Sequence, residues 1–342
     1  MEIPPSPQLE HIDIEITKDC NLNCPHCSSG KRKKGTELET KEIKKIVSSA
    51  QKLGLKRLGF TGGEPFFNFT KLRELLDFSS EQKLPVHIHS NGTLIDSEKV
   101  KIIKKNDVKL TTSLYGANKE VHEKITGMPG SFNDTINGIK NLIKNDVIPT
   151  VYFVPMKSNY VELYRLAELV KKLGGNKIRL LSLSPTGRAL DDFDKLSLSN
   201  TEIINLSESI EKIKNEIPVE IVAGFCTRIT YPELSYLDEH DSCYSAQNRV
   251  HIDAFGNVFP CTAASGVPTL SAGNVKSFNF NLKSIWVDSP YFQLLRGFHK
   301  NRPTKCLGCS IYEKCMSGCR VVTYYKYNDI SLADDCPRTP KK

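Results

Sequence analysis

The feature that most constrains this 342-residue chain is a regular alternation between residues 11 and 222 of short β-branched segments and longer amphipathic ones. The expected strands are 11–17, 56–60, 85–89, 108–114, 147–154 and 177–183. Helical periodicity is found at 37–54 and near 70–80, 96–105, 131–145, 159–173 and 199–215. Six strand–helix repeats predict an α/β fold in which a parallel sheet is covered by helices. Right-handed crossovers curl such a sheet toward a complete or partial barrel.

The last third of the chain has a different character. Helical and strand periodicity fades after about residue 224, and cysteines and turn residues dominate from Cys243 onward. Gly256-Asn257, between RVHIDAF and VFPC, predicts a hairpin turn. Bound metal can substitute for a large core in so small a region. We therefore expect a partial (β/α)6 TIM-like barrel at 1–225 and a small cysteine-rich domain at 226–342.

Composition excludes several classes of protein. The N-terminus lacks a signal-peptide pattern and no run of about 18 apolar residues occurs, so we expect a cytoplasmic location and no membrane partner. Eleven cysteines in a reducing compartment favour metal binding over disulfides, and an odd number cannot pair completely. If these thiolates hold three clusters, the formal charge of +8 falls to roughly +3. That balance gives no reason to expect a nucleic-acid partner.

CNLNCPHC, at residues 20–27, directly follows the first expected strand. Active sites of barrels lie at the carboxyl ends of the strands, so Cys20, Cys24 and Cys27 are expected on that rim. A structural zinc site would usually supply four ligands. A 4Fe–4S cluster held by only three thiolates keeps one iron free for an outside ligand. The three-cysteine loop therefore favours a cluster with an open position.

A second motif, Thr61-Gly62-Gly63-Glu64-Pro65, follows the second expected strand. Paired glycines allow a tight turn and a close approach of the backbone to a ligand. A carboxylate at this position can accept hydrogen bonds from an ammonium group. Taken alone, the motif is also compatible with an ordinary strand-to-helix turn.

The spacing Cys-x3-Cys-x2-Cys after a first strand, followed by Gly-Gly-Glu-Pro, resembles the radical S-adenosylmethionine (SAM) enzymes. The resemblance implies that SAM chelates the open iron through its amino and carboxylate groups. It also implies that Glu64 holds the amino group, with Gly62 and Gly63 shaping the turn. His26 stands where the family usually has an aromatic residue. Reductive cleavage of SAM would then give a 5′-deoxyadenosyl radical that abstracts hydrogen from a substrate.

The same resemblance implies further cofactor contacts on the rim. They are Ser90 and Asn91 at the ribose, Ser113 at the end of the fourth strand, and Asn159 after the fifth. Many relatives continue from that serine with Leu-Asp-Gly, whereas this chain has Tyr115 in place of the aspartate. No catalytic acid or base is identified. The candidates are Tyr115, His122 and Arg188. For His122, a capping or packing role is an equal alternative. Arg188 can pair with a carboxylate or remain a solvated loop residue.

Seven of the remaining cysteines match the SPASM extension, a C-terminal domain with two auxiliary clusters. The resemblance implies that Cys306, Cys309, Cys315 and Cys336 ligate one 4Fe–4S cluster. Cys243, Cys261 and Cys319 would hold the other. Cys226 either completes this second set or is a buried free thiol. We expect completion, which gives three 4Fe–4S clusters in all.

Most relatives with this extension modify peptides or proteins, so a peptide substrate is the first expectation. Against it, the first strand begins at residue 11, without the N-terminal leader-binding domain of many such relatives. The alternative is a cofactor-pathway enzyme acting on a small molecule, such as a tetrapyrrole side-chain decarboxylase. A non-catalytic zinc or iron–sulfur scaffold would not need Glu64. The resemblance also implies an electron donor such as flavodoxin or ferredoxin.

Overall fold

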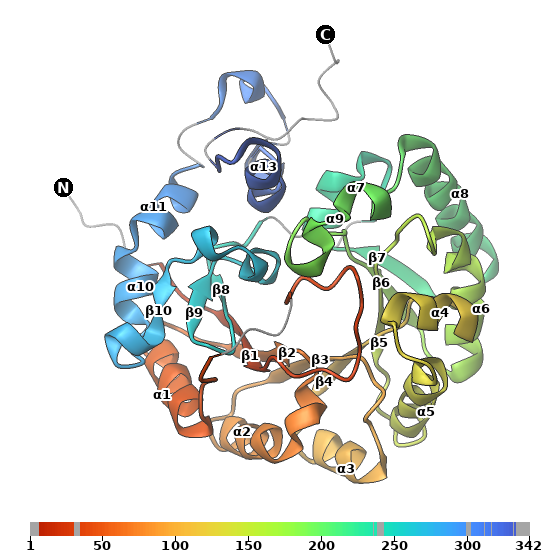
Figure 1. Ribbon diagram of the computed structural model, residues 1–342, viewed down its shortest axis with the longest axis horizontal. Helices are drawn as coiled ribbons and strands as arrows, with labels where there is room; N and C mark the ends of the chain where they lie inside the picture. Colours follow the sequence, from red (N-terminus) through yellow and green to blue (C-terminus); the bar gives the residue numbers. More distant parts are fainter. Residues whose placement is uncertain are drawn as a thin grey trace.

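The computed structural model describes residues 7–30, 35–234, 236–237, 243–298, 302–310, 312–315, 317–330 and 332. Its centre is a curved parallel sheet with helices around the outside (Figure 1). Seven strands follow one another in sequence and in space: β1 (His11–Thr17), β2 (Arg57–Gly62), β3 (Val86–Ser90), β4 (Lys109–Ser113), β5 (Thr150–Phe153), β6 (Lys177–Leu180) and β7 (Glu220–Ala223). The expected α/β fold of the partial TIM-barrel type is confirmed.

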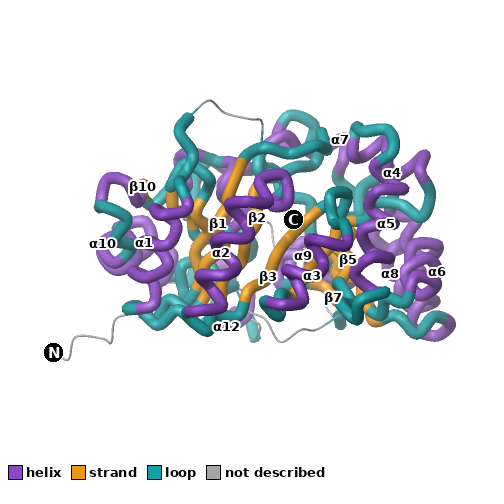
Figure 2. The backbone as a smooth tube through the Cα atoms, turned by 90° about the horizontal axis from the view of Figure 1, so that it is seen from below, coloured by secondary structure: helices purple, strands orange, loops and turns teal. Residues whose placement is uncertain are grey.

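Helices connect the strands on the outer face. They are α1 (Thr40–Gln51), α2 (Phe69–Glu81), α3 (Ser97–Lys105), α4 (Lys119–Thr126), α5 (Ser131–Ile143), α6 (Leu163–Leu173), α7 (Phe193–Leu196) and α8 (Asn200–Glu216). In α1, Ile43, Ile46, Val47 and Ala50 are buried at helical spacing, as the periodicity predicts. Figure 2 shows α1, α2 and α3 in front of β1, β2 and β3.

The sheet extends beyond the expected strands at both edges. β7 and α4 were not predicted, because each is too short to give a clear period. On the other side, β8 (Arg249–Ile252) pairs in parallel with β1, and β9 (Asn257–Phe259) pairs antiparallel with β8. The predicted hairpin is confirmed, with Gly256 at a φ of 94°. β10 (Gly273–Asn274) completes the sheet order β10-β9-β8-β1-β2-β3-β4-β5-β6-β7.

Short helices complete the C-terminal part: α9 (Phe225–Thr230), α10 (Lys283–Asp288), α11 (Pro290–Gly297), α12 (Tyr312–Cys315) and α13 (Arg320–Tyr327). Ile252 and Trp286 belong to the same hydrophobic core as Ile14 and Phe60. Residues on both sides of the expected division at 225/226 therefore share a core, and that domain boundary stays a prediction. Within the described residues, no helix is long and apolar enough to cross a membrane.

The two faces of β1 differ in chemistry. Ile12, Ile14 and Ile16 are fully buried in the core that includes the outer helices. His11, Asp13 and Glu15 alternate with them and therefore lie on the opposite, inner face. Strands of a parallel sheet are usually apolar on both faces. A charged inner face is thus a departure that points toward function.

Candidate active site

The three-cysteine loop leaves β1 at its carboxyl end and crosses the centre of the ring of strands (Figure 1). The backbone N–H of Leu22 donates to Cys20 Sγ at 3.4 Å. Burial raises the pKa of Cys24, and the charges of Cys27 and Cys20 raise it further, so the thiols lie close together. The loop also packs against a hydrophobic cluster that includes Met156. The structure therefore brings the three predicted thiols into one shielded group.

The Gly-Gly-Glu-Pro turn is pressed against the chain just before the first cysteine. The N–H of Gly63 donates to the Thr17 carbonyl and that of Glu64 to the Asp19 carbonyl, both at 2.7 Å. A Cβ atom on Gly62 would lie 2.2 Å from the Thr17 oxygen, and one on Gly63 would lie 2.1 Å from the Asp19 oxygen. Only glycine permits this approach. The turn is thereby fixed relative to the cysteine loop.

Glu64 has no exposed surface, and three donors hold its carboxylate. Ser90 Oγ donates to it at 2.8 Å, the Asn91 N–H at 2.7 Å and the Phe66 N–H at 3.1 Å. Burial raises the pKa of Glu64 to about 7, against the effect of these three hydrogen bonds. None of these three donors carries a charge. A cation beside the carboxylate would therefore favour its ionised form.

Ser90 and Asn91 both contact this carboxylate, and Asn91 connects it to the cysteine loop. Ser90 Oγ also accepts from the Gly92 N–H at 3.0 Å. The Asn91 side-chain amide donates to Cys20 Sγ at 3.8 Å and to Asn21 Oδ1 at 3.0 Å. Ser90 thus positions Glu64, and Asn91 positions both Glu64 and the first cysteine.

Three other candidates form a stack of rings beneath the loop. His26 meets Tyr115 edge-on with ring centroids 4.6 Å apart, and Tyr115 stacks on His122 at 5.9 Å. The Tyr115 N–H donates to His122 Nδ1 at 3.2 Å. A hydrogen bond with Ser113 partly offsets the burial that raises the pKa of Tyr115. Burial alone lowers the pKa of His122 to about 4, so its ring is neutral.

Asn159 and Arg188 contact backbone in this structure. Both amide hydrogens of Asn159 donate to carbonyls, those of Tyr115 and Val154, each at 3.1 Å. Arg188 Nε donates to the Cys24 carbonyl at 2.7 Å, and the Arg188 N–H donates to the Cys27 carbonyl at 2.9 Å. Arg188 therefore fastens the loop after β6 to the cysteine loop.

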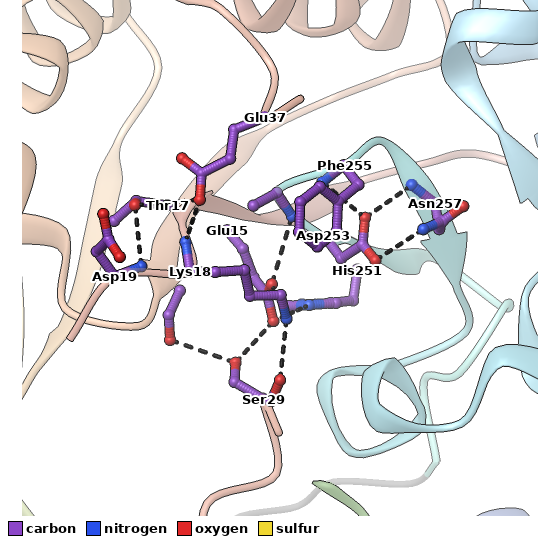
Figure 3. A network of polar contacts seen from close by, with 12 residues as sticks. Glu15, Thr17, Lys18, Asp19, Ser29, Glu37, His251, Asp253, Phe255 and Asn257 are labelled. Atoms are coloured by element: carbon purple, nitrogen blue, oxygen red, sulfur yellow. Dashed lines mark hydrogen bonds and ion pairs between the residues drawn. The ribbon is translucent and has the colours of Figure 1, made fainter. Parts of the chain in front are cut away.

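A buried network centred on Glu15 was missed from the sequence (Figure 3). Glu15 accepts from Ser29 Oγ at 2.7 Å, pairs with Lys18 Nζ at 2.5 Å and accepts from His251 Nε2 at 3.3 Å. Burial opposes ionisation of Glu15, yet the hydrogen bond from His251 and the charge of Lys18 lower its pKa to about 2. Charged residues inside a parallel strand were the available sequence signal. The network joins β1, the cysteine loop and β8.

Four cysteines of the C-terminal part meet at a second place. A hydrogen bond with Cys319 raises the pKa of Cys226, as do burial and the charges of Cys319, Cys243 and Cys261. Burial and the charges of Cys319 and Cys243 likewise raise the pKa of Cys261 to about 12. Residues separated by up to 93 positions in the sequence are thus neighbours in space.

Three of the four cysteines expected to hold the remaining cluster lie within the described residues. Cys306 and Cys309 belong to one small cluster with Tyr312, and Cys306 Sγ lies 3.6 Å from Ser317 Oγ. Cys315 ends α12, next in the chain. Cys336 lies outside the described residues. The ten described cysteines form no disulfide.

The thiol groups suit clusters better than single ions. Among the described residues, no three His, Cys, Asp or Glu side chains converge closely enough to hold one metal ion. In a 4Fe–4S cluster each thiolate binds a different iron, so the sulfurs stand further apart than around zinc. Shielded, mutually interacting thiols beside the buried carboxylate of Glu64 fit a cluster with a bound cofactor.

Comparison with known proteins gives two family matches. Residues 14–170 match the Radical SAM superfamily, and residues 243–310 match the SPASM iron–sulfur cluster-binding domain. The two matches indicate that SAM and 4Fe–4S clusters, including auxiliary clusters, are the cofactors.

Similarities to known proteins over nearly the whole chain support the same family. An AdoMet-dependent heme synthase of Methanosarcina barkeri is 29% identical over 336 residues, covering 93% of each chain. A PqqA peptide cyclase of Granulibacter bethesdensis is 26% identical, covering 95% of this chain and 86% of that protein. The crystal structure of Streptococcus suis SuiB bound to precursor peptide SuiA is similar in fold, with a TM-score of 0.79 and 21% identity over 96% of this chain and 76% of that one. This chain therefore belongs to the radical SAM enzymes, in the group that carries a C-terminal SPASM domain.

Proposed function

We propose that this enzyme uses SAM to abstract hydrogen from a peptide substrate, and that Cys20, Cys24 and Cys27 ligate the cluster at which SAM binds. When bound, that cluster and SAM supply a reducing electron and a radical able to take an unactivated hydrogen. The observation that carries the proposal is the buried Glu64 carboxylate, held by three donors beside the cysteine loop. These three donors are uncharged, and a buried carboxylate is costly to ionise unless a cationic group also pairs with it.

The chain's own residues bind and orient the cofactor. Glu64 accepts from the amino group of SAM, and the positions of Gly62 and Gly63 keep that carboxylate next to the first cysteine. Asn91 orients both groups through its backbone and side-chain hydrogen bonds. His26 and the rings packed against it exclude water from one side of the loop. Exclusion of water protects a reactive intermediate from side reactions.

The remaining cysteines would hold two auxiliary clusters, giving three clusters in all. Cys226, Cys243, Cys261 and Cys319 form one closed set, a proposal supported by their mutual effects on pKa. A closed set leaves no iron for substrate, so electron transfer is its natural role. Cys306, Cys309, Cys315 and Cys336 form the other set, on the resemblance to the SPASM extension.

A peptide is supported as the substrate by the similarity to the peptide cyclase and by the shared fold with SuiB. A second candidate, a carboxylate-bearing small molecule such as a tetrapyrrole, is supported by the similarity to the heme synthase over nearly the full length of both chains. Fold alone does not choose between these substrates.

The test is reconstitution without oxygen, followed by SAM and dithionite. We expect about twelve irons per chain, four for each cluster, and formation of 5′-deoxyadenosine. A variant with Cys20, Cys24 and Cys27 changed to alanine should keep about eight irons and form no 5′-deoxyadenosine. Continued formation by this variant, or zinc in place of iron in the wild type, would contradict the proposal. Candidate peptides and tetrapyrroles are then compared by product mass.

A further inference from the structure

The turn after β3 takes part in a closed ring of side-chain hydrogen bonds that the proposed function leaves unused. Asn91 Nδ2 donates to Asn21 Oδ1 at 3.0 Å, and Asn21 Nδ2 donates to Thr93 Oγ1 at 2.8 Å. Thr93 Oγ1 in turn donates to Asn91 Oδ1 at 2.7 Å. Asn21 directly follows Cys20 in the sequence, and Asn91 lies 70 residues later. The ring therefore joins the cysteine loop to the turn after β3.

A backbone group fixes the direction of every bond in this ring. The Thr93 N–H donates to Asn91 Oδ1 at 2.9 Å, and a backbone N–H has no acceptor role. Asn91 Oδ1 is therefore the atom that faces Thr93, and Nδ2 is the atom that faces the cysteine loop. Asn21 then presents its oxygen to Asn91 and its amide group to Thr93, because two donors do not bond to each other. Bonds that run in one direction around a ring polarise and strengthen one another.

The second amide hydrogen of Asn91 is directed at a sulfur. Asn91 Nδ2 donates to Cys20 Sγ at 3.8 Å, and the Leu22 N–H donates to the same sulfur at 3.4 Å. An asparagine side chain has two hydrogens to donate and two lone pairs that accept. The contacts of Asn91 with Asn21, Cys20 and the two donors of Thr93 use all four. In this structure the side chain keeps no hydrogen bond for the ribose of SAM, the contact that the family resemblance implies.

The surrounding chain holds Asn91 in this position. Thr135 Oγ1, from α5, donates to the Asn91 carbonyl at 3.0 Å. Gly92 turns the backbone between Asn91 and Thr93 with a φ of 79°, and a Cβ atom there would lie 2.6 Å from Thr112 Cγ2. Glycine permits both this backbone angle and this close approach. The ring is thus built on a turn that other residues would disturb.

We propose that this ring sets the reduction potential of the cluster at Cys20, by directing the Asn91 amide at the Cys20 thiolate. Asn21, Asn91 and Thr93 are then positioning residues. Hydrogen bonds to the sulfurs are among the features that set the potential of an iron–sulfur cluster. Such a bond favours the state with more negative charge, which is the reduced state, so it raises the potential.

The inference rests on the proposed function, because it requires a cluster at the cysteine loop. Reduction adds one electron, which comes from the same reductant that drives the cleavage of SAM, and no bond of the chain forms or breaks. The cluster has to be reduced before it supplies an electron to SAM. A hydrogen bond that raises the potential makes this first reduction easier.

Potentiometric titration of the reconstituted enzyme tests this role, with dithionite as the reductant and paramagnetic resonance as the readout. The signal of the cluster at Cys20 is the part of the spectrum that is missing when the three cysteines of the loop are changed to alanine. SAM is left out, so a ribose contact has no effect on the result. Asn91→Leu keeps a side chain of similar size and the backbone N–H, but it has no amide group. We expect its equilibrium constant for reduction to fall at least about threefold, or about 28 mV for one electron.

Two substitutions at Thr93 and one at Thr135 complete the set. Thr93→Val removes the hydroxyl of the ring and should lower the potential, whereas Thr93→Ser keeps the hydroxyl and should leave the wild-type potential unchanged. Thr135→Val is the matched control, because it removes a buried hydroxyl that bonds to the Asn91 carbonyl and not to the amide. We expect this control to have the wild-type potential. The reduced wild type should also show a proton that is coupled to the cluster, exchanges in D2O and is missing in Asn91→Leu.

A wild-type potential in Asn91→Leu would overturn the proposal, and weaker SAM binding in that variant would then assign the side chain to the ribose. An equal fall in Thr135→Val and Thr93→Val would overturn it as well. If Asn91→Leu binds too little iron to be titrated, the comparison of Thr93→Val with Thr93→Ser decides. When no signal is missing in the variant without the three cysteines, the proposed function fails too. When that signal is present but does not shift, only this inference fails.

Discussion

Replacing Glu15 by glutamine should destabilise the enzyme strongly without changing the size of the side chain. Glu15 has no exposed surface, and its carboxylate meets Lys18, Ser29, His251 and the N–H of Ala254 (Figure 3). Glutamine keeps one acceptor oxygen, but its NH2 group then faces donors of the network and cannot accept their hydrogen bonds. The buried Lys18 ammonium then loses its counter-charge.

Two independent estimates give the loss of stability expected for Glu15→Gln. The fall of the Glu15 pKa from 4.5 to about 2 corresponds to about 3 kcal/mol of stability at neutral pH. Removing one partner of a buried ion pair typically costs about 3–5 kcal/mol. Both give the same order of magnitude. For a chain of this size, about 2 °C per kcal/mol implies a melting temperature lower by about 6 °C or more.

The assay is anaerobic thermal unfolding of the reconstituted enzyme, followed by circular dichroism. Glu37→Gln is the matched control, because Glu37 belongs to the same network but is partly exposed and accepts from the Lys18 N–H at 2.6 Å. We expect a loss of about 1 kcal/mol for this control. Iron release to a chelator should also be faster in Glu15→Gln, since Ser29 lies two residues after Cys27.

The pH dependence gives a further check with a definite sign. A carboxylate with a lowered folded pKa contributes stability that is complete above its unfolded pKa, 4.5 here, and is lost as pH falls through about 2. The difference between wild type and Glu15→Gln should therefore shrink below about pH 4.5. Equal melting temperatures of the two proteins at neutral pH would refute the reasoning.

Two other predictions concern the cofactor sites. Glu64→Gln should weaken SAM binding at least about tenfold, the equivalent of a charge-assisted hydrogen bond, while iron content stays near the wild-type value. Since the Glu64 pKa is about 7, wild-type affinity for SAM should fall between about pH 8 and about pH 6, and the variant should lose this dependence. An unchanged dissociation constant would mean that Gly-Gly-Glu-Pro is only a turn. Cys226→Ala, made in the background lacking the three cysteines of the first loop, should alter the paramagnetic resonance of one auxiliary cluster and speed its loss of iron. Spectra and iron retention identical to the parent protein would show that Cys226 is no ligand.

The local residue pattern was enough to predict the part of this protein in which strands and helices alternate. The alternation HIDIEIT predicts β1 with the observed bounds, because side chains of a strand change face at every residue. Six of the seven parallel strands of the barrel follow in the same way. The cysteine loop and Glu64 could be expected on one rim, since parallel strands end at the same edge of the sheet.

Only the tertiary structure decided which distant segments meet. β8 lies beside β1 although 231 residues separate Thr17 from Arg249, and this pairing brings His251 to Glu15. Counting the cysteines led us to expect Cys226 in the same set as Cys319, but spacing left a buried free thiol as the alternative, and only the structure places the two thiols together. Periodicity reports which face of an element is buried, but it does not report which element covers that face. The polar inner face of the sheet depends on its curvature in the same way, because Asp13, His89 and Arg249 come from three strands that are far apart in the sequence.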